Sequence, residues 1–239
     1  MTLVAEKTAL VTGSSSGIGL AIVHSLLDTG CRVIGIARDH SKTGIHNPLF
    51  ISHDQDLSNL KQSEQLIKKI CREHTIDIFI HCAGEGLFGS IEQFSVTQID
   101  NNIRTNLTSA LLLAHYLVPQ MRKRSASNFV IIGSESAIQA GKKGALYSSA
   151  KFGLRGLALS LREDCARDGI CVTLINPGMV DSPFFDQQNF RPGKDPSNAI
   201  TPEDIAECVQ HVLTSPSTLV YDEINLTPRN KSIDFKPQH

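Results

Sequence analysis

The stretch Thr12-Gly13-Ser14-Ser15-Ser16-Gly17-Ile18-Gly19 decides which fold this sequence can adopt. A short apolar run, 8–12, precedes it, and a segment with apolar residues at helical spacing, 22–27, follows it. Glycines permit a tight turn and let backbone N–H groups approach a pyrophosphate, while the helix N-terminus contributes partial positive charge. On its own the glycine spacing also fits a flexible loop without a ligand. The strand before it and the helix after it indicate a dinucleotide-binding turn.

The rest of the chain alternates short β-branched or apolar runs with longer segments of helical period. This alternation is typical of βαβ units around a parallel sheet whose strands are buried on both faces. We therefore predict an α/β, Rossmann-type doubly wound parallel sheet of about seven strands, with helices on both faces. The predicted strands are 8–12, 32–37, 49–52, 76–81, 128–133, 170–176 and 220–226.

Two predicted helices and one long connection bear on the site. The helices cover 97–124 and 147–168, and Gly169 stands just past the second as a C-cap. The segment 181–199 is rich in Pro, Phe, Asn and Gly and is too long for an ordinary connection, which indicates a substrate lid. The length fits a single dinucleotide-binding and catalytic domain over 1–239.

Composition and charge argue against several classes of protein. The chain has 23 Lys and Arg against 24 Asp and Glu, so no overall field draws it to nucleic acid or an anionic membrane. Its six cysteines form no C-x-x-C pair, which is typical of reduced thiols in a cytosol. We see no targeting signal and no apolar run near the roughly 20 residues that cross a bilayer. We expect a soluble, cytoplasmic protein that acts on a small molecule.

The end of the second predicted strand, Ile36-Ala37-Arg38-Asp39, bears on which dinucleotide binds. In this fold an acidic residue about 20 positions after the glycine turn holds the ribose 2′-hydroxyl of NAD, whereas an arginine accommodates the 2′-phosphate of NADP. Ala37 cannot accept the hydroxyl's hydrogen bond, and Arg38 can pair with a phosphate. NADP(H) is therefore favoured over NAD(H). In the alternative, Arg38 is a solvated charge and Asp39 holds the ribose.

Tyr147 and Lys151 lie four residues apart at the start of the helix 147–168, so their side chains share one face. A phenol with a pKa near 10 is a poor acid-base catalyst at neutral pH, but an adjacent ammonium stabilises the phenolate and lowers that pKa. The pair predicts that Tyr147 donates or accepts a proton. An ordinary surface pair has the same spacing, and the neighbouring motifs decide against it.

Taken in order, these motifs resemble the short-chain dehydrogenase/reductase family over nearly the whole chain. The resemblance rests on the glycine motif 12–19, Asn106, Ser134, Tyr147 with Lys151, and Asn176-Pro177-Gly178. It implies an NADP(H)-dependent enzyme that acts on CH–OH groups and interconverts a small alcohol and a ketone or aldehyde by hydride transfer. The runs 201–206 and 222–226 most resemble the branch of 3-hydroxy-acid dehydrogenases and carbonyl reductases.

The resemblance also assigns roles to individual residues. Tyr147 exchanges the proton, Ser134 hydrogen-bonds the substrate oxygen, Lys151 also holds the nicotinamide ribose, and Asn106 anchors a water leading to Lys151. Ser182 stands where the family usually has threonine. With the glycine turn and Arg38, the expected cofactor-binding residues are Gly13, Ser15, Ser16, Gly17, Ile18, Gly19, Arg38, Asp56, Leu57, Ala83, Gly84, Tyr147, Lys151, Pro177, Gly178, Val180 and Ser182. The resemblance further implies a homotetramer, or a dimer, built through the helices 97–124 and 147–168.

The sequence departs from the family pattern after the fourth strand, where His81-Cys82-Ala83-Gly84 replaces Asn-Asn-Ala-Gly. Ala83 and Gly84 still allow the cofactor to approach. The second asparagine normally ties neighbouring strands together, and Cys82, a weak donor, does not replace it fully. We interpret Cys82 as an inert small hydrophobe, with redox sensing as the alternative, and His81 as structural. The histidines show no metal-binding spacing, so we expect no metal.

The expected lid and pocket give conflicting cues about the substrate. Glu85 and Glu135 disfavour an anion, whereas Arg191 and Lys194 attract one, and each also fits a solvated charge. Three phenylalanines either close an apolar lid over the reacting centre or pack the lid against itself: Phe184, Phe185 and Phe190. Two other functions stay open, a 3-oxoacyl thioester reductase and a non-catalytic NADP-binding sensor or scaffold.

Overall fold

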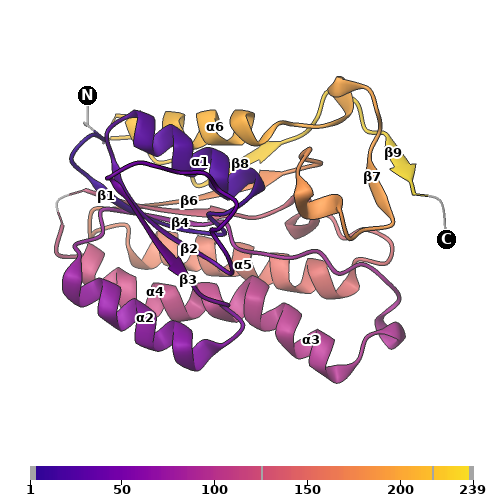
Figure 1. Ribbon diagram of the computed structural model, residues 1–239, viewed down its shortest axis with the longest axis horizontal. Coiled ribbons are helices and arrows are strands. Elements are labelled where there is room, and N and C mark those ends of the chain that lie inside the picture. The colour runs from indigo at the N-terminus through magenta and orange to yellow at the C-terminus, as the bar shows by residue number, and fades with distance from the viewer. Residues whose placement is uncertain (1–3, 125, 217, 237–239) are drawn as a thin grey trace.

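The computed structural model describes residues 4–124, 126–216 and 218–236. In this part of the chain, seven parallel strands form one sheet in the order β3-β2-β1-β4-β5-β6-β8 (Figure 1). The order reverses between β1 and β4, and doubly wound sheets bind dinucleotides at such a switch point. The predicted fold class is confirmed. The strands are β1 (Thr8–Thr12), β2 (Arg32–Ala37), β3 (Phe50–Asp54), β4 (Ile78–His81), β5 (Ser127–Ile132), β6 (Ile170–Pro177) and β8 (Glu223–Leu226).

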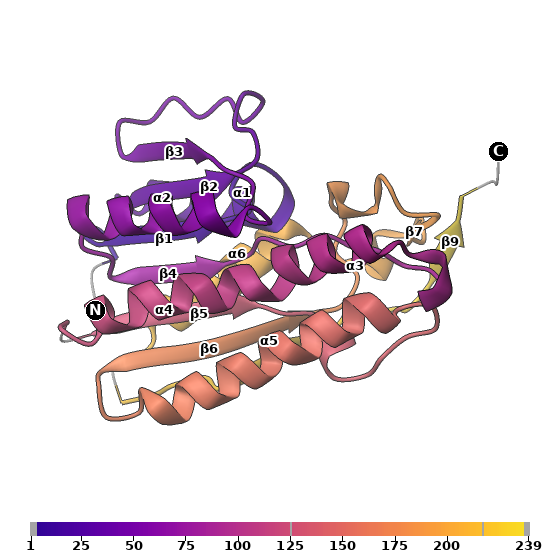
Figure 2. The same cartoon turned by 90° about the horizontal axis from the view of Figure 1, so that it is seen from below.

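Helices cover both faces of this sheet (Figures 1 and 2). Leu10 packs under α2, α4 and α5, while its neighbour Val11 packs under α1 and α6, and both are fully buried. Because successive residues of a strand point to opposite faces, burial on both sides explains why the strands are almost continuously apolar. The helices are α1 (Gly17–Asp28), α2 (Leu60–Glu73), α3 (Val96–Ile103), α4 (Ser109–Met121), α5 (Ala145–Asp164) and α6 (Pro202–Thr214).

Both helices predicted near the site differ in detail from the prediction. The helix expected over 97–124 consists of α3, a π-helical turn at Arg104–Thr108, and α4. The apolar periodicity continues through the wider turn, so the sequence does not reveal it. The second helix ends at Asp164, with Cys165 as its C-cap. Gly169 does not cap it; its positive φ of 73° instead directs the chain into β6.

The predicted lid segment forms a small sheet with the C-terminal part of the chain. β7 (Phe190–Pro192) pairs antiparallel with β9 (Ile233–Phe235), and Phe190 lies opposite Phe235. Figure 1 shows this two-stranded sheet at the end of the molecule away from the N-terminus. Two short 3₁₀ turns, Pro183–Phe185 and Pro196–Asn198, flank β7. No local sequence pattern predicts this pairing.

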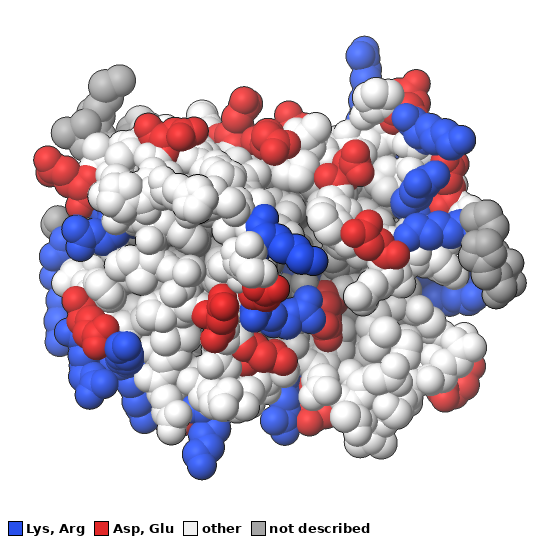
Figure 3. All heavy atoms as spheres, in the orientation of Figure 1, with Lys and Arg blue, Asp and Glu red and all other residues white. Residues whose placement is uncertain are grey.

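Acidic and basic side chains lie next to one another across the face seen in Figure 3. This mixture agrees with the formal net charge of −1. Within the described residues, no helix combines the length and apolar character that crossing a membrane requires.

Candidate active site

The glycine turn has the geometry of a phosphate cradle. Gly13 and Gly17 adopt positive φ values of 67° and 51°. A Cβ on Gly19 would lie 2.1 Å from the carbonyl oxygen of Gly13, so only glycine allows this approach of helix to turn. No side chain caps the N-terminus of α1 after Ser16. Its first N–H groups and their partial positive charge therefore suit a phosphate.

Several charged residues lie at the adenosine end of the predicted cofactor site. Arg38 is exposed and takes part in none of the ion pairs that the described residues form. Burial raises the pKa of Glu85, and the positive charge of Arg38 opposes that rise, so the two lie close enough to interact. The Asp39 carboxylate accepts a hydrogen bond from the backbone N–H of Ser41 at 2.8 Å, which lowers its pKa. Asp56 is exposed after β3, and the next residue, Leu57, is buried.

A buried hydrogen-bonded chain behind the glycine turn was missed by the sequence analysis. The Nε2 of His40 lies 2.8 Å from the hydroxyl of Ser14, and its Nδ1 lies 2.6 Å from Oδ1 of Asp54. The side chains of Ser14 and His40 are buried, so this serine is not an accessible nucleophile. The chain joins the turn after β1 to β3 and holds the loop that carries Arg38. No spacing rule indicates such contacts between segments so far apart in the sequence.

Thr12 links the end of β1 to the segment 81–84, which departs from the family pattern. Its Oγ1 accepts hydrogen bonds from the backbone N–H groups of Cys82 at 3.1 Å and Ala83 at 3.0 Å, and it lies 3.2 Å from Nδ1 of His81. A strand tie is therefore present without an asparagine. Since Thr12 already accepts twice, its own proton goes to Nδ1 of His81, and Nε2 carries the ring proton.

Both residues that replace the asparagines sit in an apolar environment. Burial lowers the pKa of His81 to about 3, aided by the positive charge of Lys151, so His81 is neutral at physiological pH. Burial raises the pKa of the Cys82 thiol to about 12. A thiol of this kind is a poor nucleophile, which agrees with the inert interpretation of Cys82.

Asn106 lies in the π-helical turn and is fully buried. Its side chain accepts a hydrogen bond from the backbone N–H of Glu85 and donates to the carbonyl oxygens of Glu85 and Asn102, each at 3.0 Å. A Cβ on Gly84 would lie 2.8 Å from Oδ1 of Asn106 and 3.5 Å from Nζ of Lys151. Through these hydrogen bonds Asn106 holds the segment after β4 beside Lys151. Asn106 lies in a π-helical turn, a feature that is frequent at functional sites.

Ser134, in the turn after β5, comes together with Tyr147 and Lys151 of α5, and its side chain hydrogen-bonds Tyr147. Nζ of Lys151 lies 5.6 Å from the centre of the Tyr147 ring and donates to the carbonyl oxygen of Ile132 at 3.3 Å. The exposed fractions are 9% for Ser134, 7% for Tyr147 and 4% for Lys151, so solvent screens these groups little.

The acid-base properties of the pair differ from the sequence prediction. Burial raises the pKa of the Tyr147 phenol to about 12, and hydrogen bonding by Ser134 opposes the rise. Burial lowers the pKa of Lys151 to about 8. The predicted lowering of the phenol pKa is therefore wrong for this structure, because desolvation of the charged form outweighs the effect of a neighbouring ammonium.

A polar network of residues from β6, β8 and α5 holds Ser134 in position; this side of the site is called below Ser134, and the side of the lid is called above Tyr147. Oδ1 of Asn176, in β6, accepts a hydrogen bond from the backbone N–H of Ser134 at 3.2 Å. Its Nδ2 donates to Oε1 of Glu223 at 2.7 Å and to Oδ1 of Asn225 at 3.0 Å. Arg155 of α5 then binds Glu223 through Nε and Nη2 at 2.9 and 3.0 Å. Asn176 is 1% exposed, so each of its polar atoms needs a partner inside the protein.

The segment after β6 runs past the glycine turn before it becomes the lid. Pro177 ends β6, Val180 is buried and pairs with Ile200, and the Ser182 side chain lies against Gly17. Gly178 lies beside the carboxylate of Glu135.

Neither carboxylate that was expected near the substrate is free to act alone. Glu135 pairs with Lys231 at 3.2 Å. Burial raises the pKa of Glu85, and Asn106 holds its backbone. Arg191 and Lys194 are exposed on the lid.

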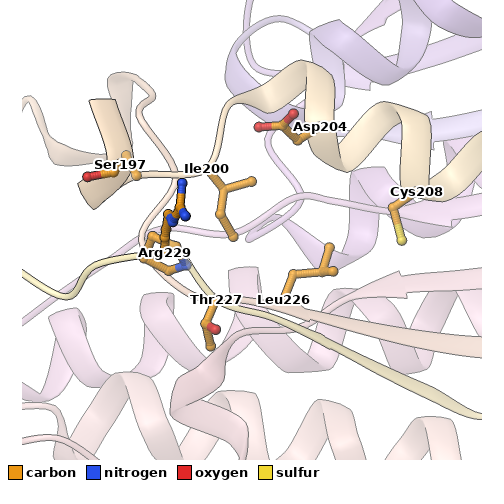
Figure 4. A pocket seen from close by; sticks show the side chains of 9 residues that line it. Ser197, Ile200, Asp204, Cys208, Leu226, Thr227 and Arg229 are labelled. Carbon is orange, nitrogen blue, oxygen red and sulfur yellow. The ribbon is translucent and has the colours of Figure 1, made fainter. Parts of the chain in front are cut away.

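A hollow of about 370 Å³ lies beside α6, apart from these residues. Figure 4 shows side chains from the end of the lid, from α6 and from the segment after β8 around it, including Ser197, Cys208 and Arg229. None of the expected catalytic residues lines it. Among the described residues, His, Cys, Asp and Glu side chains form no group of three or more that could hold a metal ion.

Comparison with known proteins agrees with this geometry. The family model for short chain dehydrogenase matches residues 7–192. An uncharacterized oxidoreductase of Staphylococcus aureus (strain USA300) is 32% identical over 236 residues, covering 95% of this chain and all of the relative. An uncharacterized oxidoreductase of Staphylococcus epidermidis is 29% identical over 234 residues, with the same coverage.

Two solved structures share the fold. A putative NAD(P) dependent gluconate 5-dehydrogenase from Beutenbergia cavernae with bound NADP has a TM-score of 0.82 and 23% identity, covering 93% of this chain and 95% of its own. A single-site variant of actinorhodin polyketide ketoreductase with NADPH has a TM-score of 0.77 and 23% identity, covering 92% of this chain and 95% of its own. At these identities the likeness concerns the fold alone.

Proposed function

Because this chain belongs to the short-chain dehydrogenase family and is an NAD(P)-dependent oxidoreductase, we propose that it interconverts a small alcohol and a ketone or aldehyde with NADP(H). The observation that carries the proposal is the convergence of Ser134, Tyr147 and Lys151 in one buried place beside the glycine turn. The whole chain, 1–239, acts in this proposal as one catalytic domain with a lid at 181–199.

In reduction, the hydroxyl of Ser134 binds the carbonyl oxygen and Tyr147 donates a proton to it. The raised pKa of Tyr147 keeps the phenol protonated at neutral pH, so the resting group is a proton donor and suits the reductive direction. Lys151, with a pKa lowered to about 8, is mostly charged at pH 7 and can return the proton. A bound nicotinamide supplies or accepts the hydride. In the family, the nearby Asn106 anchors a water that leads to Lys151, and we extend that role to this chain.

The cofactor fits the glycine turn, whose uncapped helix N-terminus and close backbone approach suit a pyrophosphate. NADP(H) is preferred in this proposal because Arg38 has no carboxylate partner among the described ion pairs, whereas the Asp39 carboxylate is engaged by Ser41. The residues proposed to hold the cofactor are Gly13, Ser15, Ser16, Gly17, Ile18, Gly19, Arg38, Asp56, Leu57, Ala83, Gly84, Tyr147, Lys151, Pro177, Gly178, Val180 and Ser182.

Assembly and location belong to the same proposal. α4 and α5 carry exposed apolar side chains, namely Leu111, Phe152 and Leu159, which a homotetramer or dimer formed through these helices would cover. A cytoplasmic location follows from the reduced cysteines expected from the sequence. Sedimentation that finds only monomer at micromolar concentration would contradict the assembly.

The test follows, at 340 nm, oxidation of NADPH and of NADH by ketones and a 3-oxoacyl thioester analogue, and reduction of NADP⁺ and of NAD⁺ by 3-hydroxy acids, for the natural protein and Tyr147→Phe. We expect turnover that prefers NADPH and is lost in the variant. Turnover of the thioester alone would favour an acyl thioester reductase. Cofactor binding without turnover in either protein would favour a sensor or scaffold.

A further inference from the structure

Two phenylalanine side chains, Phe88 and Phe184, lie beside the ring of Tyr147, and a third, Phe190, packs against Phe88. We propose that this aromatic cluster, defined as Phe88, Phe184 and Phe190, selects an uncharged carbonyl substrate that carries an aryl group beside the reacting carbon. The inference rests on the proposed function, since it concerns the substrate of the same site.

The cluster is assembled from separate parts of the chain. The ring centre of Tyr147 lies 5.0 Å from that of Phe88, in the segment after β4, and 5.8 Å from that of Phe184, in the lid. Phe190, in β7, lies 5.1 Å from Phe88 with the rings edge to face. Aromatic pairs attract most in tilted or edge-to-face arrangements at such distances. An aryl group at the carbonyl would therefore meet ring edges and faces already arranged to receive it.

Two of these rings pack directly over Gly86, where a larger residue would displace them. A Cβ on Gly86 would lie 2.5 Å from Cζ of Phe184 and 2.9 Å from Cε2 of Phe88. Gln188 of the lid donates to the carbonyl oxygen of Gly86 at 2.9 Å and so fastens the lid at the same place. The lid therefore closes directly over the ring of Tyr147.

Packing of the lid against itself centres on Phe185, whose ring centre lies 5.1 Å from that of Phe184 and 5.6 Å from that of Phe190. Phe185 is buried, and the ammonium of Lys236 donates to its carbonyl oxygen at 2.7 Å. Phe88, Phe184 and Phe190 are only partly buried. Apolar surface that remains partly exposed around a reacting group gains from a ligand that covers it. These three rings are thus available to a substrate in a way that Phe185 is not.

The basic residues of the lid and of the segment that crosses it are directed elsewhere. Arg191 follows Phe190 in β7, so it points to the opposite face of the strand, and it is exposed. Lys231 pairs with Glu135, and Lys236 binds main-chain oxygens. Arg229 lines the separate hollow beside α6 (Figure 4). Lys194 is exposed on the lid, and the ammonium of Lys151 beside Tyr147 donates to the carbonyl oxygen of Ile132. A substrate anion in the aromatic cluster would therefore lose its hydration without gaining an unengaged countercharge from these residues.

The experiment compares kcat/KM with NADPH for three α-keto compounds: ethyl benzoylformate, ethyl pyruvate and benzoylformate. Ethyl pyruvate lacks the aryl group, and benzoylformate carries a negative charge that the two esters lack. We expect ethyl benzoylformate to exceed each of the other two by about tenfold or more, since filling an apolar pocket commonly changes kcat/KM by that much. Equal values for the two esters, or a preference for benzoylformate, would overturn the inference.

Two variants locate the selectivity. Phe184→Ala and Phe88→Leu should bring the ratio between the two esters toward one, while Phe235→Ala, a 76% exposed ring on β9, should leave it unchanged. Circular dichroism and Tm check that each variant is folded, and Phe184→Leu replaces an unstable alanine variant. A ratio that stays above about ten in both cluster variants would contradict the inference.

The two proposals can fail separately. If the protein reduces ethyl pyruvate in a Tyr147-dependent way but does not prefer the aryl ester, the inference about the substrate class fails and the proposed function stands. If NADPH binds and neither these three compounds nor any member of the wider panel turns over, the proposed function fails, and the inference fails with it.

Discussion

The site has two sides built on different principles. Below Ser134, the polar network of Asn176, Glu223 and Arg155 joins β5, β6, β8 and α5 through buried or partly buried hydrogen bonds. Above Tyr147, the aromatic cluster consists of ring contacts, and the lid that carries two of its rings is held by the pairing of β7 with β9 and by partly buried hydrogen bonds from Gln188 and from Lys236, just after β9. Directional bonds fix the reacting groups, whereas apolar contacts tolerate a range of shapes. This difference predicts that changes below the site cost stability, while changes above it alter substrate use.

The largest effect is expected for Asn176→Ala. The change leaves the buried N–H of Ser134 without a partner and removes one hydrogen bond each from Asn225 and from Glu223, which keeps Arg155, so it should cost roughly 3 to 4 kcal/mol. The free energy of unfolding from denaturant titration measures it. Asn225→Ala removes only one partner of Asn176 and should cost less than about 1 kcal/mol. Equal losses in the two variants would mean that the network does not act as a unit.

Lys151→Met should abolish turnover and yet stabilise the fold at pH 7. The native pKa of Lys151 is about 8 against an ordinary 10.5, so its charge opposes folding by about 3 kcal/mol at neutral pH. Between pH 8 and 10.5 Lys151 binds more protons in the unfolded chain than in the folded one, so its contribution makes stability rise with pH in the natural protein. The raised pKa values of Cys82 and Tyr147 lower stability above about pH 9 in both proteins. The variant should lack that rise. Unfolding titrations from about pH 7 to 10 test both points, and a variant less stable at pH 7 contradicts them.

His40→Ala breaks the link between the glycine turn and β3. We expect a loss of about 1–2 kcal/mol, because two hydrogen bonds disappear and Asp54 is largely solvated. The KM for NADPH should rise while kcat is kept, since Ser14 loses its support. His46→Ala, an exposed histidine in the same connection, is the matched control. An unchanged KM in His40→Ala would separate this hydrogen-bonded chain from the cofactor site.

The smallest change in stability is expected above the site, for Lys236→Met. It removes two hydrogen bonds to the main chain of the lid, at Phe185 and Asp186, near the surface. Stability should fall by less than about 1 kcal/mol, while the KM for the carbonyl substrate rises about threefold. Lys194→Met, on the same lid, should change neither quantity. A loss of stability as large as that of Asn176→Ala would show that the two sides do not differ as described.

The sequence by itself determined the features that local patterns encode. Strand and helix periodicity predicted the doubly wound sheet, and the strand before the glycines identified the turn that Gly13, Gly17 and Gly19 form. The four-residue spacing of Tyr147 and Lys151 placed them on one helix face. These inferences succeed because backbone geometry and side-chain direction follow from neighbours in the chain.

Only the tertiary structure decided which buried polar groups meet and how strongly water is excluded. The contact of His40 with Ser14 and Asp54, the tie from Thr12 to Cys82, and the pairing of β7 with β9 join residues 14 to 70 positions apart. The pKa directions of Tyr147 and Lys151 depend on burial, which no spacing reports. The physical reason is that partners and desolvation arise when distant segments pack together, and local sequence carries no record of either.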